Sequence, residues 1–354
     1  MQVRILAVNA FLDALVDGFE LGADKWISLP IVIHSNSFPY MLSLVIIIPK
    51  GCGLVSLNVF LELVEIKAKT ASVVPFFLGM AFSLYYFHSL NWPLAIIFFV
   101  AMFLFNMAVD MLDNYNDYNH AVDQQNYKQK TNIIGRERLS PRLVLTLLVT
   151  FSVVAALLGC WLVYRAGWPV LWMGMFCFAV GILYSSGPHP LSSLPCGELA
   201  SGFTMGFMIV LLSVYLNAYQ QFEWNWATLW RVFIVALPDE LWISNLMLAN
   251  NICDAQEDDD NQRTTIVHFI GKRNALIAFS AKNVLAFAMI IVSPFLKIAP
   301  MTVWLTLVIL PFTYHQNKLL MQKQVKSETF ICGVKILLVG SLAQLLTYWL
   351  GIVI

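Results

Sequence analysis

Long apolar stretches, separated by short polar segments, run along the chain from Ala71 to its end. A helix needs about 20 mostly apolar residues to cross a bilayer. The nine stretches of about this length are 71–90, 92–113, 141–163, 168–186, 197–218, 227–250, 273–294, 298–316 and 329–352. Two longer polar loops, 114–140 and 251–272, lie between them, and no gap is long enough for a soluble domain. The pattern predicts an all-α membrane protein built as a bundle of nine transmembrane helices.

The composition excludes a soluble protein. Of the 354 residues, 59% are hydrophobic and 12% are charged, whereas soluble proteins carry roughly 25% charged residues. The formal net charge is zero, so we expect the lipid bilayer as a partner and no nucleic acid. The six cysteines are scattered and form no CxxC pair, which argues against a disulfide framework or a zinc site.

The distribution of lysine and arginine predicts the orientation. If the segment before the first span is cytoplasmic, the segments on that side carry thirteen basic residues and the opposite side carries three. Cytoplasmic loops carry the excess of Lys and Arg. We therefore expect a multi-pass protein of the cell membrane with loops 114–140 and 251–272 facing the cytoplasm.

The first 54 residues differ from the rest, because their mixed and apolar segments are broken by Pro39 and by the polar run 34–37. The codons of residues 50–53 can contain a purine-rich ribosome-binding sequence shortly before Val55, whose codon can initiate translation. We predict that 1–54 is a leader from a mis-annotated start and that 55–354 is the transmembrane domain. A genuine amphipathic or signal-like leader is the alternative.

An acidic stripe closes the second apolar stretch. Asp110, Asp113 and Asp117 are spaced i, i+3 and i+7, which puts them on one face of a helix. Asn106 lies one turn deeper in the membrane, on the face of Asp110.

A second stripe closes the sixth stretch in the same order. Asn250, Asp254 and Asp258 are spaced i, i+4 and i+8, again on one face. Each stripe is followed by basic residues in its loop. Acids at the end of a span often mark only the place where a helix reaches water, and either stripe alone permits that interpretation.

Two such stripes on one predicted side favour a shared metal site. A carboxylate in a membrane helix costs about 2.5–3.5 kcal/mol on insertion scales, and converging carboxylates repel one another. Mg²⁺ prefers carboxylate oxygens and keeps positions open for substrate phosphates. The stripes and their basic loops therefore predict a site for a metal-bound diphosphate.

A diphosphate site at the mouth of a lipid-embedded bundle indicates a substrate with a polar head and a long apolar tail, such as a polyprenyl diphosphate. Metal and basic residues would stabilise the departing diphosphate. The allylic cation left behind needs a dry pocket with aromatic faces, and we select Tyr184 among the aromatic residues.

The sequence resembles the UbiA superfamily of intramembrane aromatic prenyltransferases, and within it the 1,4-dihydroxy-2-naphthoate prenyltransferases of menaquinone synthesis. "NNICDAQEDD" matches the second Asp-rich motif of that family. "VDMLDNYND" matches the first, with Val109 where the family usually has Asn, and Asn106 is the candidate substitute. "LYSSGPHPLSSLPCGE", "VEIKAKTASVVP" and "RTTIVHFIGKR" also resemble family segments, so that the likeness covers about 58–354.

This resemblance implies a nine-helix bundle with both motifs at its cytoplasmic mouth and Mg²⁺ as the cofactor. It implies transfer of a polyprenyl group to 1,4-dihydroxy-2-naphthoate, with loss of CO₂ and diphosphate, giving demethylmenaquinone. The implied metal ligands are Asp110, Asp113, Asp117, Asp254 and Asp258, and all of these except Asp110 are also implied to be catalytic. The implied diphosphate contacts are Lys69, Asn106, Lys130, Arg136, Asn250 and Arg263, and the implied prenyl or aromatic contacts are Tyr184 and Glu198.

Two alternatives stay open. The acceptor could be another aromatic compound, such as 4-hydroxybenzoate. A cation or lipid transporter would instead need acids near the bilayer midplane, and often repeat symmetry, whereas these acids gather at one face and no repeat is obvious.

Four further charges fall inside predicted spans. Asp239 and Glu240 lie about 22 Å of helix from Asp254, too far to bind the same metals, so either a functional contact or a misplaced span boundary explains them. For Lys282 and Lys335 we favour snorkelling of the ammonium to the membrane surface.

Overall fold

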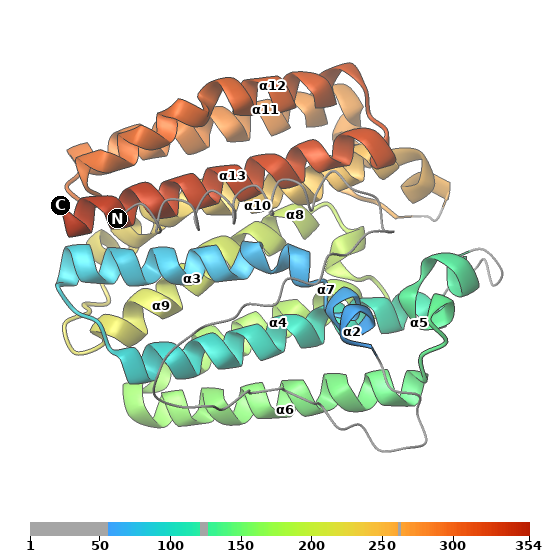
Figure 1. The fold of residues 1–354 in the computed structure, drawn as a ribbon, viewed down its shortest axis with the longest axis horizontal. Helices are drawn as coiled ribbons and strands as arrows, with labels where there is room; N and C mark the ends of the chain where they lie inside the picture. Colours follow the sequence, from blue (N-terminus) through green and yellow to red (C-terminus); the bar gives the residue numbers. More distant parts are fainter. Residues whose placement is uncertain (1–55, 121–126, 261–262) are drawn as a thin grey trace, which may run out of the picture. The chain divides into compact units, whose positions relative to one another are not determined.

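The computed structural model describes residues 56–120, 127–260 and 263–354, and all regular secondary structure within these ranges is helical (Figure 1). The α-helices are α2 (Leu57–Leu63), α3 (Thr70–Phe82), α4 (Trp92–His120), α5 (Ile133–Arg136), α6 (Pro141–Ala166), α7 (Trp168–Ser185), α8 (Gly197–Ser201), α9 (Ile209–Ala218), α10 (Trp226–Asp260), α11 (Ile266–Phe295), α12 (Leu310–Gln322) and α13 (Lys326–Val353). Shorter 3₁₀ or π-helical segments are Ile66–Lys69, Ser83–Phe87, Tyr127–Thr131, Leu191–Ser193, Gly202–Met208 and Met301–Ile309. The predicted leader, 1–54, lies outside the described residues.

Eight helical spans in the described part of the chain are long and apolar enough to cross a membrane. They are Ile66–Phe87, Trp92–His120, Pro141–Ala166, Trp168–Ser185, Gly197–Ala218, Trp226–Asp258, Ile266–Phe295 and Lys326–Val353. They confirm eight of the nine predicted stretches.

The ninth stretch, 298–316, stays a prediction. It consists of the 3₁₀ segment Met301–Ile309 and the start of α12. Pro311 stands in the first turn of α12, and a proline has no backbone N–H to continue an α-helical ladder from the preceding turn. One uninterrupted α-helix therefore does not run through this stretch.

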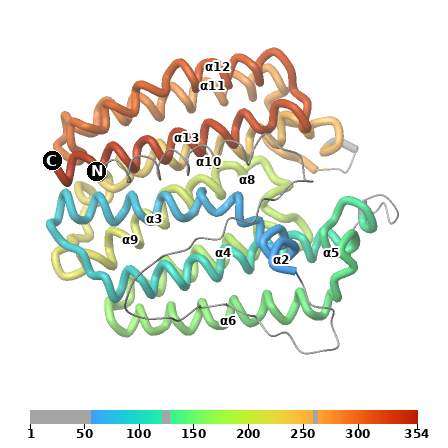
Figure 2. Tube along the Cα trace, in the orientation of Figure 1, coloured from blue at the N-terminus to red at the C-terminus, as the bar shows by residue number. Residues whose placement is uncertain are grey.

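The two helices that carry the acidic stripes are longer than an ordinary span. α4 has 29 residues and α10 has 35, which correspond to about 43 Å and 52 Å, against a hydrocarbon core of about 30 Å. Figures 1 and 2 show both helices ending on the side of the bundle where α5 lies. Their acidic ends therefore reach the same end of the bundle.

A small hydrophobic cluster supports the end of α4 beside its acidic stripe. Met107, Ala108 and Met111 are buried on the neighbouring face of α4. They pack with residues of α2, α5 and α6, namely Leu63, Val64, Ile133, Ile134 and Val144. The apolar face holds the helix while the acidic face stays available.

Two glycines bring the π-helical segment Gly202–Met208 against the backbone of α10. A Cβ on Gly206 would lie 2.4 Å from the Cα of Glu240, and one on Gly202 would lie 2.6 Å from its carbonyl oxygen. Small residues four apart permit this close approach of membrane helices. The contact fixes α8 beside the middle of α10.

We expect Gly206→Ala to destabilise the protein by about 1–3 kcal/mol, because the added methyl group must push two backbones apart. Thermal unfolding of the purified protein in detergent measures this change. Gly159→Ala in α6 is the matched control, because no described atom lies within 4 Å of the position of its added Cβ. Equal stability of the two variants would contradict the role of the close contact.

Candidate functional site

A lysine from another helical segment forms an ion pair with the acidic stripe of α4. Lys69, at the end of the 3₁₀ segment Ile66–Lys69, is only 3% exposed. Its ammonium forms an ion pair with Asp110 and donates a hydrogen bond to the carbonyl oxygen of Asn106 at 3.2 Å. Glu65 turns the chain into this segment with a left-handed backbone, φ 47°, a conformation that costs roughly 1–2 kcal/mol for a residue with a Cβ. Local strain thus accompanies the placement of this cation.

Two basic side chains also form ion pairs with the acidic stripe of α10. The Nζ of Lys326, at the start of α13, lies 2.5 Å from Oδ2 of Asp254. The Nε of Arg263 lies 3.5 Å from Oδ1 of Asp258. Both aspartates are buried, and Oδ2 of Asp258 has no hydrogen-bond partner among the described residues.

Arg263 joins the end of α10 to the connection between α7 and α8. Its guanidinium pairs with Asp258, and its Nη2 donates to the carbonyl oxygen of Ser192 at 3.3 Å. Tyr184 lies near the end of α7 and is half-buried.

The connection between α7 and α8 holds this arrangement from both sides. Asn116 of α4 donates to the carbonyl oxygen of Ser185 at 2.8 Å and to Oγ of Ser186 at 2.9 Å. On the other side, the backbone N–H of Thr264 donates to the carbonyl oxygen of Ser193 at 3.0 Å. The connection is therefore tied to α4 by the side-chain amide of Asn116 and, by a backbone hydrogen bond, to the segment that follows α10.

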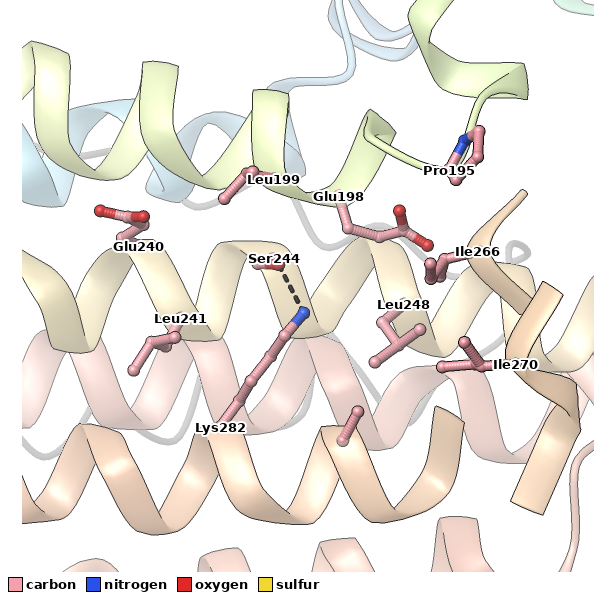
Figure 3. A pocket seen from close by; sticks show the side chains of 11 residues that line it. Pro195, Glu198, Leu199, Glu240, Leu241, Ser244, Leu248, Ile266, Ile270 and Lys282 are labelled. Atoms are coloured by element: carbon pink, nitrogen blue, oxygen red, sulfur yellow. Dashed lines mark hydrogen bonds between the residues drawn. The ribbon is translucent and has the colours of Figure 1, made fainter. Parts of the chain in front are cut away.

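A cavity of about 210 Å³ lies deeper along α10 (Figure 3). Glu198 on α8 accepts a hydrogen bond from Asn251 on α10 at 2.8 Å and also lines the cavity. Lys282 extends from α11 and donates to Oγ of Ser244 at 2.7 Å. Its ammonium points into the protein, so the prediction that Lys282 snorkels to the membrane surface is wrong.

Asp239 and Glu240 lie inside α10, which continues through Pro238. Asp239 is fully buried and Glu240 is 6% exposed. A misplaced span boundary therefore does not explain these two acids.

The carboxylates of the stripes do not form a ready-made metal centre. In the described part of the chain, no three His, Cys, Asp or Glu side chains are grouped so that they could hold a metal ion. The orphaned and buried Oδ2 of Asp258 is nevertheless an atom that fits a hard cation, because Mg²⁺ prefers carboxylate oxygens. The five-aspartate metal set stays a prediction.

The model of the family described as the UbiA prenyltransferase family matches residues 72–352. This chain belongs to the UbiA prenyltransferase family. Two curated relatives carry the name 1,4-dihydroxy-2-naphthoate octaprenyltransferase. The protein from Bacillus subtilis (strain 168) is 26% identical over 226 residues, which are 63% of this chain and 69% of that protein. The protein from Mycobacterium leprae (strain TN) is 24% identical over 184 residues, which are 52% of this chain and 60% of that protein.

Solved structures of UbiA homologues share the fold. The homologue from Aeropyrum pernix K1 superposes with a TM-score of 0.62 at 17% identity, covering 79% of this chain and 98% of that one. The homologue from Archaeoglobus fulgidus bound to GPP and Mg²⁺ gives a TM-score of 0.60 at 10% identity, covering 84% of this chain and 100% of that one.

Most residues that the UbiA motifs indicated lie at the ends of α4 and α10 or in the segments beside them. Asp117 is exposed at the outer end of its stripe, and Asn250 is half-buried beside Asn251. Their roles stay predictions, as does that of Lys130, which is exposed on Tyr127–Thr131.

Arg136 forms ion pairs with residues outside the two acidic stripes. Its Nη2 lies 2.6 Å from Oε1 of Glu62, and its Nε lies 3.1 Å from Oε1 of Glu137. These carboxylates bind the guanidinium at the surface of α5, and the contact of Arg136 with the diphosphate stays a prediction.

Sequence reasoning missed Lys326 as a site residue. Its position predicted only the orientation of the last span, because it lies far along the chain from Asp254. The available signal was that Lys326 stands at the start of a span, on the side of the membrane where both acidic stripes were predicted to lie.

We expect Lys326→Gln to lower stability by roughly 1–3 kcal/mol, because a buried carboxylate on Asp254 loses its charged partner. Denaturant or thermal unfolding of the purified protein measures the loss. Lys323→Gln is the matched control, because its partner Glu328 is exposed, and exposed pairs contribute at most about 1 kcal/mol. Adding Asp254→Asn to Lys326→Gln should recover part of the loss, and full additivity of the two changes would contradict the pairing.

Proposed function

We propose that this chain transfers a polyprenyl group from polyprenyl diphosphate to 1,4-dihydroxy-2-naphthoate, releasing CO₂ and diphosphate and giving demethylmenaquinone in its reduced, quinol form. The observation that carries the proposal is that the acidic ends of α4 and α10 lie at the same end of the bundle, each paired with a cation from another segment. The names of the two curated relatives support the acceptor. The Archaeoglobus fulgidus homologue, which binds GPP and Mg²⁺, supports a prenyl diphosphate as donor.

The basic residues of the site would bind the diphosphate. Lys69, Arg263 and Lys326 already lie against the aspartates, so an anion entering between α4 and α10 meets three cations from three parts of the chain. Such fixed charges stabilise negative charge as it develops on a leaving group. Asn106 and Asn250, on the same faces, are the proposed polar contacts beside them.

The aspartates would hold the metal. We assign this role to Asp110, Asp113, Asp117, Asp254 and Asp258, and the free oxygen of Asp258 fits it. Bound Mg²⁺ would neutralise these carboxylates and polarise the diphosphate oxygens. Asp113, Asp117, Asp254 and Asp258 are accordingly the residues whose loss should abolish catalysis.

In the proposed reaction, a carbon–oxygen bond of the donor is replaced by a carbon–carbon bond to the acceptor. The bond between the allylic carbon and the diphosphate oxygen breaks, and its electron pair leaves with the diphosphate. The ring carbon that bears the carboxylate forms the new carbon–carbon bond. The bond to CO₂ then breaks and returns its electron pair to the ring, so the product forms first as the quinol. The ring of Tyr184, near the end of α7, would face the electron-poor allylic carbon and exclude water.

We also propose that the site faces the cytoplasm at the cell membrane, because the excess of Lys and Arg lies on that side of the predicted spans. The head of the substrate would bind at the ends of α4 and α10. The isoprenoid tail would stay among apolar helices.

The proposal is tested with the full chain in lipid vesicles supplied with 1,4-dihydroxy-2-naphthoate and a radiolabelled polyprenyl diphosphate. We expect lipid-soluble demethylmenaquinone and CO₂ with Mg²⁺, and neither with EDTA. Asp113→Ala and Asp254→Ala should each lower the rate at least about 100-fold, the scale for removing a group that stabilises transition-state charge. Glu223→Ala, an exposed acid remote in sequence from both stripes, is the control and should retain activity.

Product with 4-hydroxybenzoate but not with the naphthoate would keep prenyl transfer and overturn the acceptor. Absence of product with either aromatic acceptor would overturn the proposed function, and flux of a cation or lipid across the vesicle would then be measured.

A further inference from the structure

The three cations at the acidic helix ends differ in how firmly the chain holds them. Lys69 is buried, and its ammonium contacts both a carboxylate and a backbone carbonyl oxygen of α4. The guanidinium of Arg263 contacts Asp258 and also donates to the carbonyl oxygen of Ser192. Each of these two cations therefore has two partners that keep it in place.

The third cation, Lys326, is held by one contact. Its Nζ lies 2.5 Å from Oδ2 of Asp254, and within the described ranges its ammonium has no second hydrogen-bond partner. Its side chain is 55% exposed. Lys326 is also the first residue of α13, where the positive end of the helix dipole disfavours a cation. Of the three cations, Lys326 can therefore leave its carboxylate most easily.

This lysine stands where a metal ion would bind α10. Asp254 and Asp258 lie one turn apart on one face of the helix, and Oδ2 of Asp258 has no hydrogen-bond partner in the described part of the chain. A divalent cation on Asp254 would lie near the Lys326 ammonium. Positive charges a few ångströms apart repel each other, most strongly where water is scarce. Metal binding at Asp254 therefore requires the ammonium to move away.

A displaced ammonium needs another anion to bind. The diphosphate of the proposed donor carries oxygens that accept charge-assisted hydrogen bonds from lysine. The lysine side chain is a flexible four-carbon stem with a compact charge at its end, and the exposure of Lys326 leaves it room to reorient. The diphosphate can therefore replace Asp254 as the partner of this lysine.

We propose that Lys326 is an exchangeable cation, which neutralises Asp254 in the metal-free protein, yields this carboxylate to Mg²⁺ and then binds an oxygen of the diphosphate. The inference rests on the proposed function and adds how the site controls metal binding. Because the lysine competes with the metal but assists the diphosphate, Mg²⁺ and diphosphate should each strengthen the binding of the other. The metal-free protein also avoids an unpaired carboxylate near the hydrocarbon layer.

The test measures binding of Mg²⁺ and of inorganic diphosphate to the full chain in detergent, without a prenyl substrate or an aromatic acceptor. In Lys326→Gln we expect the dissociation constant of Mg²⁺ alone to fall about 10-fold, because its competitor is gone. At saturating Mg²⁺ we expect the dissociation constant of diphosphate to rise about 10-fold. Both factors are at the low end for a hydrogen bond to a charged group. An ion pair with a purely structural role would not change the two constants in opposite directions.

Two other variants provide the comparison. Lys323→Gln removes a neighbouring cation whose partner, Glu328, is exposed, and it should leave both constants unchanged. Asp254→Asn removes the carboxylate for which lysine and metal compete, so it should weaken Mg²⁺ binding. An Mg²⁺ dissociation constant in Lys326→Gln that equals or exceeds that of the wild type would overturn the exchange. An unchanged diphosphate constant would overturn the transfer of the lysine to the diphosphate.

A second measurement uses the wild type alone and does not depend on the folding of a variant. An amine-reactive reagent labels accessible lysines, and peptide mass spectrometry gives the labelling rate at Lys326. Mg²⁺ alone should raise this rate, because the ammonium leaves Asp254, and Mg²⁺ with diphosphate should lower it again. Lys323 is the internal control and should be labelled equally in all three states. Equal labelling of Lys326 in these states would contradict the exchange.

The outcomes separate this inference from the proposed function. A wild type that prenylates the naphthoate, while the labelling of Lys326 does not respond to Mg²⁺, would overturn the exchange alone. A wild type that binds neither Mg²⁺ nor diphosphate would overturn the metal site, and the proposed function with it.

Discussion

Each acidic helix end in this structure depends on a cation that another segment of the chain supplies. Asp110 pairs with Lys69 before α3, and Asp254 pairs with Lys326 at the start of α13. A carboxylate near the hydrocarbon layer is costly when it is alone, and a buried carboxylate that loses its charged hydrogen-bond partner is left unsatisfied. These pairs accompany the packing of α3 on α4 and of α10 on α13. The ion pairs therefore join helices that also pack against each other.

Local patterns predicted most of the fold, because hydropathy and helical spacing are properties of neighbouring residues. The eight confirmed spans and the acidic faces of α4 and α10 follow from them. Partners that are distant in sequence did not follow: Lys326 was not recognised as the partner of Asp254, nor Glu62 as a partner of Arg136. The inward direction of Lys282 depended on the space left between three packed helices, which no single-helix pattern contains.

α10 carries both the second acidic stripe and part of the wall of the cavity. Its outer end carries the stripe, and the same face continues inward through Asn251 toward the cavity. The glycine contact at Gly202 and Gly206 holds α8 against this helix, and thereby holds Glu198 beside Asn251. Because both features lie on one helix, α10 itself sets the distance between the acidic helix end and the cavity.

The pairing of Asp254 with Lys326 also has a consequence for how the chain is made. Lys69 precedes Asp110, so the first acidic stripe can be neutralised as soon as α3 and α4 enter the membrane together. Asp254 has to wait for α13, because its cation is the first residue of the last helix. Until α13 has been made, the carboxylate of Asp254 has no lysine beside it. A polypeptide that stopped before α13 would keep this carboxylate without that partner, with the cost that an unpaired charge near the hydrocarbon layer carries.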